Sequence, residues 1–132
     1  MENKNDLTRD IFVEWETLVN ICGEEEMVRS IIEVFLDEGV YTLGMIDKAV
    51  SERNTADIKL YSHRMKGTAR YLGDEDFVQK CYAAELAATS GKLDDAIELT
   101  KAIRPVTEKY LTFFSRPDWE ELLKQKADLQ SR

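Results

Sequence analysis

Apolar residues recur every three or four positions along most of the chain, and few residues interrupt this pattern. The 132 residues include only six glycines and two prolines, so long stretches can remain helical. No segment has the alternating pattern of a half-buried strand. The spacing therefore predicts an all-α protein: an antiparallel up-down four-helix bundle with an extra short N-terminal helix and a C-terminal helix.

Glycine, proline and capping residues predict where the helices begin and end. Gly39 falls within the apolar stripe of the longest helix, where it predicts a bend or a close helix contact. The apolar positions between residues 93 and 113 predict one long bundle helix, which Pro105 should kink. The expected helices span residues 11–23, 24–53, 54–72, 75–90 and 93–115, and a last helix begins at Pro117.

The length fits a single domain, which we divide into a polar tail over residues 1–10, a helical bundle over residues 11–115 and a helical extension over residues 116–132. The chain has no apolar run long enough for a membrane span and no signal-peptide core at its start. Its net charge of −8 disfavours nucleic acid and anionic membranes as partners. We expect a cytoplasmic monomer, in which Cys22 and Cys81 are buried free thiols.

The helix predicted over residues 54–72 carries an unusual concentration of positive charge. Residues 55–72 hold four basic side chains and one acidic one, a net charge of +3 in an otherwise acidic chain. The only histidine of the chain, His63, lies in this segment. A helical projection turns Ile58, Met65 and Leu72 inward and places His63 on the opposite face. A basic region in an acidic protein predicts local binding of an anion.

Lys66 and Gly67 follow His63 by three and four positions, where helical side chains are neighbours. We expect an exposed lysine that meets a group attached to the imidazole, and a glycine that leaves space beside it. A glycine within a helix costs about 1 kcal/mol relative to alanine, so this one requires a reason. The pattern alone also permits an ordinary surface histidine. A metal site has no second histidine or cysteine at ligand spacing, so we expect none.

The segment His63-Arg64-Met65-Lys66-Gly67-Thr68, followed by Leu72-Gly73, resembles the signature of histidine phosphotransfer domains, which reads H-x-x-K-G-[ST or A] with a later L-G. The resemblance continues through Cys81 and Glu85, which match the C-x-x-x-E helix of that family, and covers most of residues 11–115. Arg70 and Tyr71 are bulkier than the residues often found there. Pro105 and the helix after Pro117 lie outside the usual plan of the family.

The resemblance implies a carrier in a two-component phosphorelay. His63 would take a phosphoryl group from the phosphoaspartate of one receiver domain and pass it to another, with receivers of hybrid histidine kinases and response regulators as partners. Lys66 would stabilise the phosphate charge and Gly67 would give access. The domain would have no ATP site, no autokinase activity and no cofactor of its own, since the receiver would supply Mg²⁺. Sequence alone leaves two competing classes: a helical adaptor that binds signalling partners without phosphorylation, and an enzyme with an unrecognised site.

We expect a receiver-binding surface around His63. Leu60 and Tyr71 project away from the inward stripe, so either a neighbouring helix covers them or they form the apolar part of a transient interface. Lys59 and Arg64 would supply its charged rim. The predicted partner-binding residues are Ala56, Lys59, Leu60, Arg64, Arg70 and Tyr71.

Overall fold

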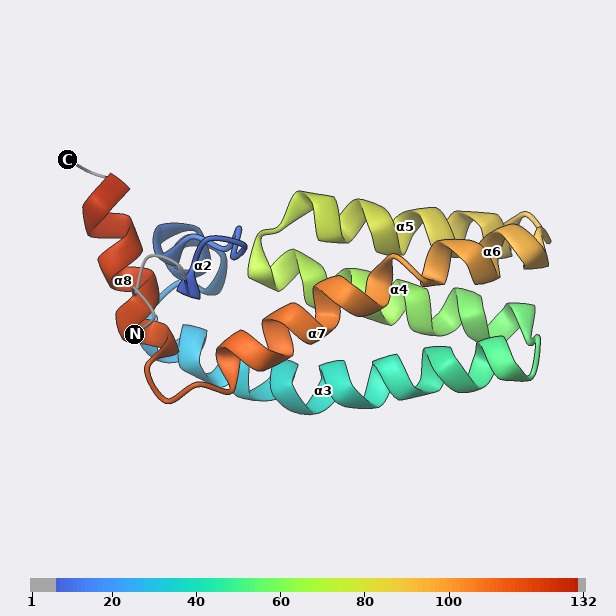
Figure 1. Cartoon of the computed structure of the whole chain (residues 1–132), viewed down its shortest axis with the longest axis horizontal. Helices are drawn as coiled ribbons and strands as arrows, with labels where there is room; N and C mark the ends of the chain where they lie inside the picture. The colour runs from blue at the N-terminus through green and yellow to red at the C-terminus, as the bar shows by residue number, and fades with distance from the viewer. Residues whose placement is uncertain (1–6, 131–132) are drawn as a thin grey trace.

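The computed structural model describes residues 7–130, and the regular secondary structure of this part consists of helices, with no strand (Figure 1). This confirms the all-α prediction. The described helices are α2 (Trp15–Cys22), α3 (Glu25–Ser51), α4 (Thr55–Leu72), α5 (Glu75–Thr89), α6 (Leu93–Thr100), α7 (Ile103–Phe114) and α8 (Trp119–Gln130).

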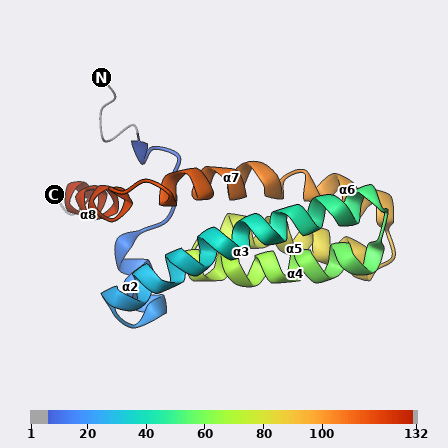
Figure 2. The ribbon, with the colours of Figure 1, turned by 90° about the horizontal axis from the view of Figure 1, so that it is seen from below.

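The bundle has four antiparallel positions (Figures 1 and 2). Three of them are occupied by α3, α4 and α5, and the fourth is occupied by the consecutive helices α6 and α7. Helix α4 lies between α3 and α5, and α7 crosses back over α3 to complete the bundle. The core includes Phe35 from α3, Met65 from α4, Phe77 from α5 and Tyr110 from α7, all of them buried. The up-down four-helix prediction is therefore confirmed.

Local capping interactions fix both ends of α4 at the predicted residues. The Asn54 side chain accepts a hydrogen bond from the amide of Asp57, which satisfies one donor of the first turn. Gly73 ends the helix with a φ of 74°, in the left-handed region where glycine is favoured. Both signals are local, which explains why the sequence predicts this helix so closely.

The turn from α4 to α5 is attached to α7 by a buried carboxylate. Asp74 caps α5 by accepting a hydrogen bond from the amide of Phe77, and it also accepts one from the hydroxyl of Tyr110. Burial and this hydrogen bond raise the pKa of Tyr110, so its hydroxyl remains a donor. The two contacts fix the end of α4 relative to the last bundle helix.

The prediction of one helix from residue 93 with a kink at Pro105 is wrong. The chain instead breaks at Lys101 and Ala102, between α6 and α7. Pro105 is the third residue of α7, where an amide has no partner within the helix and proline is tolerated. The break also changes the buried face, because Leu99 of the predicted stripe is exposed while Ile103 is buried.

The two terminal helices are shorter than predicted. Helix α2 begins at Trp15, because Ile11 and Val13 are buried in a non-helical segment that precedes it. The carbonyl groups of Ile11 and Val13 accept hydrogen bonds from Lys126 of α8. An α-helix over residues 11–14 would not direct both carbonyl groups at this lysine. Helix α8 begins at Trp119, two residues after Pro117.

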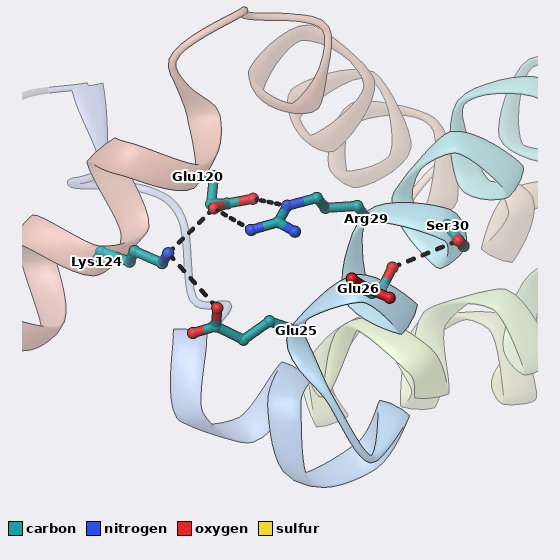
Figure 3. A network of polar contacts seen from close by, with 6 residues as sticks. All are labelled: Glu25, Glu26, Arg29, Ser30, Glu120 and Lys124. Atoms are coloured by element: carbon teal, nitrogen blue, oxygen red, sulfur yellow. Dashed lines mark hydrogen bonds and ion pairs between the residues drawn. The ribbon is translucent and has the colours of Figure 1, made fainter.

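Helix α8 packs on α2 and on the first turn of α3. Leu122 and Leu123 are buried in the main core cluster, and the Trp119 ring lies 6.4 Å from that of Trp15. A polar network covers these contacts (Figure 3): Arg29 donates two hydrogen bonds to Glu120, and Lys124 binds Glu120 and Glu25. The predicted extension therefore shares its core with the bundle.

Gly39 is buried where α3 meets α7, as its place in the stripe predicts. A Cβ atom there would lie 3.1 Å from Leu111 Cδ2, so the glycine permits a close helix contact. Cys22 and Cys81 are free thiols, but only Cys81 is buried, so the expectation for Cys22 is wrong. Within residues 7–130, no helix is both long and apolar enough to cross a membrane.

Candidate functional site

His63 lies near the middle of α4 with its side chain 62% exposed. The predicted inward stripe explains this position, since Ile58, Met65, Ala69 and Leu72 are all buried on the opposite face. The imidazole is therefore presented on a regular helix whose other side is held by the core. Such a support fixes the backbone beneath the ring while leaving the ring open to a partner.

Glu85 of α5 links His63 to Lys66. One carboxylate oxygen lies 2.8 Å from Nδ1 of His63, and the other lies 2.7 Å from Nζ of Lys66. The Glu85 side chain is only 14% exposed, so water screens these contacts weakly. The three side chains form a chain of polar contacts across the α4–α5 interface, with the exposed histidine at its outer end.

Glu85 is ionised in this arrangement. Burial raises the pKa of Glu85, but hydrogen bonds from Lys66 and His63 lower it by more, so the pKa lies below its ordinary value. An ionised carboxylate can only accept hydrogen bonds. We therefore assign the proton to Nδ1 of His63, which leaves the lone pair of a neutral ring on Nε2.

Lys66 is not the exposed lysine that the sequence analysis expects. Its side chain is only 10% exposed, because it extends between α4 and α5 to reach Glu85. Its ammonium group also lies 4.8 Å from the centre of the Tyr82 ring, at cation–π distance. A lysine in this setting is held by its partners, so its charge is directed at Glu85 rather than at solvent.

Gly67 faces open space, since an added Cβ would meet no atom within 4 Å. Packing within the protein therefore gives no reason for a glycine here. Lys59 and Arg70 are exposed on the α5 side of the same helix, and Ala56 is exposed one turn before Lys59. Lys59, Leu60, His63 and Glu85 border a shallow hollow together with Ala56.

Leu60 and Tyr71 are 47% and 52% exposed, so no helix covers them and the first of the two alternatives for these residues is excluded. Leu60 borders the hollow beside Glu85, whereas Tyr71 lies on the α3 side of α4. An apolar groove of about 520 Å³ runs there between α3 and α4, bordered by Gly67 and Tyr71. Helix α3 contributes Met27, Ile31 and Val34 to it, which the sequence analysis did not identify.

Arg64 stands at the edge of this groove and is held by neighbouring side chains. Its guanidinium lies 5.7 and 5.8 Å from the ring centres of Tyr41 and Tyr61, and 3.3 Å from Glu38. The predicted partner-binding residues are thus all exposed, but they fall on two sides. The α5 side is cationic and the α3 side is largely apolar.

Glu85 is the principal site residue to which the sequence analysis gave no role. The sequence did carry a signal for Glu85, because this residue is the glutamate of the C-x-x-x-E match and follows the buried Cys81 by four residues. Burial raises the pKa of the Cys81 thiol to about 12, so this thiol stays protonated at neutral pH and behaves as a core side chain. The described residues also contain no group of three or more His, Cys, Asp and Glu side chains that could hold a metal ion.

A family model described as "Hpt domain" matches residues 30–128, which is most of the chain and includes all the site residues described above except Met27. Comparison with curated proteins and with solved structures gives no match.

Proposed function

The chain belongs to the Hpt domain family, and from this premise we propose that His63 accepts a phosphoryl group from the phosphoaspartate of one receiver domain and transfers it to another. Membership in the family implies phosphotransfer in a two-component phosphorelay, in which Hpt domains are carriers and not kinases. The observation that carries the proposal for His63 is its exposed ring, whose Nδ1 is bound by the ionised Glu85.

Glu85 prepares the ring for nucleophilic attack. With the proton on Nδ1, the Nε2 lone pair attacks the phosphorus of the phosphoaspartate. The bond between phosphorus and the aspartate oxygen breaks, and its electron pair remains on the aspartate as a carboxylate. The phosphorylated ring keeps its Nδ1 proton and becomes cationic, and the Glu85 carboxylate stabilises this charge.

The reverse transfer uses the same arrangement. A carboxylate of the second receiver attacks the phosphorus, the bond between phosphorus and Nε2 breaks, and the electron pair returns to Nε2. The neutral ring with a proton on Nδ1 is recovered, so no proton enters or leaves in either direction. We expect the receivers to supply the Mg²⁺ that both steps need, and this chain to bring no cofactor.

The groove between α3 and α4 is the apolar part of the proposed receiver-docking surface. Its walls include exposed Met27, Val34 and Tyr71, and it reaches Gly67 beside His63. Lys59 and Leu60 border the hollow that contains the same histidine, and Arg64 borders the groove. A small surface that combines apolar residues with a charged rim suits a partner that must dissociate after each transfer.

The test is transfer from phosphorylated receivers to the purified chain, followed by intact mass measurement. We expect one added phosphoryl group on the wild type and none on His63→Gln. We expect this variant to keep its fold, because His63 is exposed. Phosphorylation of His63→Gln would refute the assignment. Receiver binding without any transfer would favour the adaptor instead.

A further inference from the structure

A phosphoryl group on Nε2 of His63 needs a cation that the Lys66 side chain does not offer. Such a group carries close to two negative charges at neutral pH. Lys66 is 2.7 Å from Glu85 and lies over the Tyr82 ring, on the Nδ1 side of the imidazole. If Lys66 turned toward solvent, Glu85 would lose its cation while still largely buried.

Arg70 is the one arginine of residues 7–130 without a hydrogen bond, ion pair or ring contact. An arginine without a partner is unusual in a chain whose acidic residues outnumber its basic ones, 26 to 18. Arg70 is exposed and borders a polar hollow between α4 and α5, next to Lys66. The other arginines of this part are all engaged. Arg9 makes an interaction as well, and the ion-pair partners of the rest are Glu120 for Arg29, Asp94 for Arg53, Glu38 for Arg64, Asp47 and Glu108 for Arg104, and Asp118 for Arg116.

Helix geometry aligns Arg70 with His63. Seven residues make almost two turns, so the two side chains leave α4 within about 20° of each other and about 10.5 Å apart along its axis. Helical side chains lean toward the N-terminus, which directs the long Arg70 side chain toward His63. Between them lies Gly67, whose Cβ position is open. The other position between them is Lys66, whose side chain turns inward to Glu85 and is only 10% exposed, so it leaves the outer surface of α4 open.

We propose that Arg70 is the phosphoryl-binding cation of this site, its guanidinium reaching over Gly67 to the phosphoryl oxygens on Nε2 of His63. The planar guanidinium matches two oxygens of a phosphoryl group and is permanently charged. Lys66 then has a different task, which is to position Glu85. This inference rests on the proposed function, since it needs His63 to be phosphorylated.

The experiment uses phosphoramidate as a chemical phosphodonor, so that no receiver is required. Nε2 forms a bond to phosphorus, the phosphorus–nitrogen bond of phosphoramidate breaks, and ammonia leaves. In protein labelled with ¹⁵N-arginine, we expect phosphorylation to shift the Arg70 Nε–H signal and to slow its exchange with water. Arg70→Ala should lower the rate of phosphorylation about tenfold, as expected for loss of a charge-assisted hydrogen bond.

The matched control is Arg53→Ala, which removes the same charge from an exposed arginine beyond the N-terminus of α4. We expect its rate to stay within about twofold of wild type, because salt screens charges at that range. An unmoved Arg70 signal, or an equal loss in Arg70→Ala and Arg53→Ala, would overturn the role of Arg70 while leaving His63 as the acceptor. A wild type that takes no phosphoryl group on His63 would overturn the proposed function as well.

Discussion

At the scale of single residues, the site depends on one carboxylate that serves two partners. Glu85 holds the Nδ1 proton of His63 on one oxygen and the Lys66 ammonium on the other. The pKa of Glu85 in the folded protein lies below that of an unfolded glutamate, which is about 4.3. Ionised Glu85 therefore stabilises the fold above about pH 4.3, and this contribution is lost as pH falls through the lower folded value. At neutral pH Glu85 is ionised, so this contribution to stability is fully present.

Replacement of Lys66 by methionine should therefore destabilise the fold. The apolar side chain fills similar space but leaves the largely buried Glu85 without its cation, which we expect to cost about 1–3 kcal/mol of unfolding free energy. Lys59→Met is the control, because Lys59 is exposed, and it should change stability by less than about 0.5 kcal/mol. Chemical denaturation at pH 7 measures both. Equal stability of the two variants would show that the Lys66–Glu85 pair contributes little.

Gly67→Leu should distinguish the effect of this position on helix stability from its effect on the access of a receiver to His63. Leucine favours a helix by close to 1 kcal/mol over glycine, and the open space at Gly67 accommodates its Cβ. We expect an equal or higher melting temperature together with blocked transfer from a phosphorylated receiver. Gly67→Ala, with a smaller side chain, should gain stability and keep most of the transfer. Normal transfer by folded Gly67→Leu would show that the glycine is incidental.

At the scale of elements, local signals determine the bounds of α4, whereas distant contacts determine where α6 ends and α7 begins. Asn54 and Gly73 end α4 through contacts within a few residues, so the sequence predicts its bounds. No glycine or proline stands at the break between α6 and α7, and only packing against the rest of the bundle reveals it. The burial of Lys66 likewise depends on Glu85, which lies 19 positions further along the chain and on another helix.

The attachment of α8 should depend on pH. The hydrogen bond from Arg29 lowers the pKa of Glu120 to about 2 (Figure 3). An unfolded glutamate has a pKa of about 4.3, so the pair stabilises α8 above that pH and loses its effect as pH falls toward 2. Glu120→Gln should thus be less stable than wild type by about 1 kcal/mol at pH 6, and the difference should disappear near pH 2.

Fluorescence of Trp15 and Trp119 reports this contact, because they are the only two tryptophans and lie side by side. Glu33→Gln, on the exposed surface of α3, is the control and should match wild type throughout. A stability difference between Glu120→Gln and wild type that stays constant from pH 6 to pH 2 would contradict this account of α8.

At the scale of the whole molecule, the bundle supports a surface with one histidine between a cationic side and an apolar side. The core stripe of α4 allowed His63, Leu60 and Tyr71 to be placed on the outer face from sequence, and all three are exposed. The groove itself was not predicted, because Met27, Ile31 and Val34 come from α3 and their place beside Tyr71 depends on how the two helices pack.

Leu60→Asp and Tyr71→Asp should weaken receiver binding without unfolding the protein, since both side chains are already exposed. Val40→Asp, on an exposed part of α3 that does not border the groove, is the control and should bind normally. Titration of a receiver into ¹⁵N-labelled protein, followed by amide shifts, measures the affinity and locates the contact. Shifts that avoid the His63 face would mean that the receiver docks elsewhere.

The most direct test of the account is to identify the nitrogen that carries phosphorus. The chain has a single histidine, so a long-range ¹H–¹⁵N spectrum of ¹⁵N-labelled protein reports His63 alone. After transfer from a phosphorylated receiver, we expect coupling between ³¹P and Nε2, with the proton retained on Nδ1 beside Glu85. Phosphorus on Nδ1, or transfer that leaves the histidine signals unchanged, would contradict the central claim.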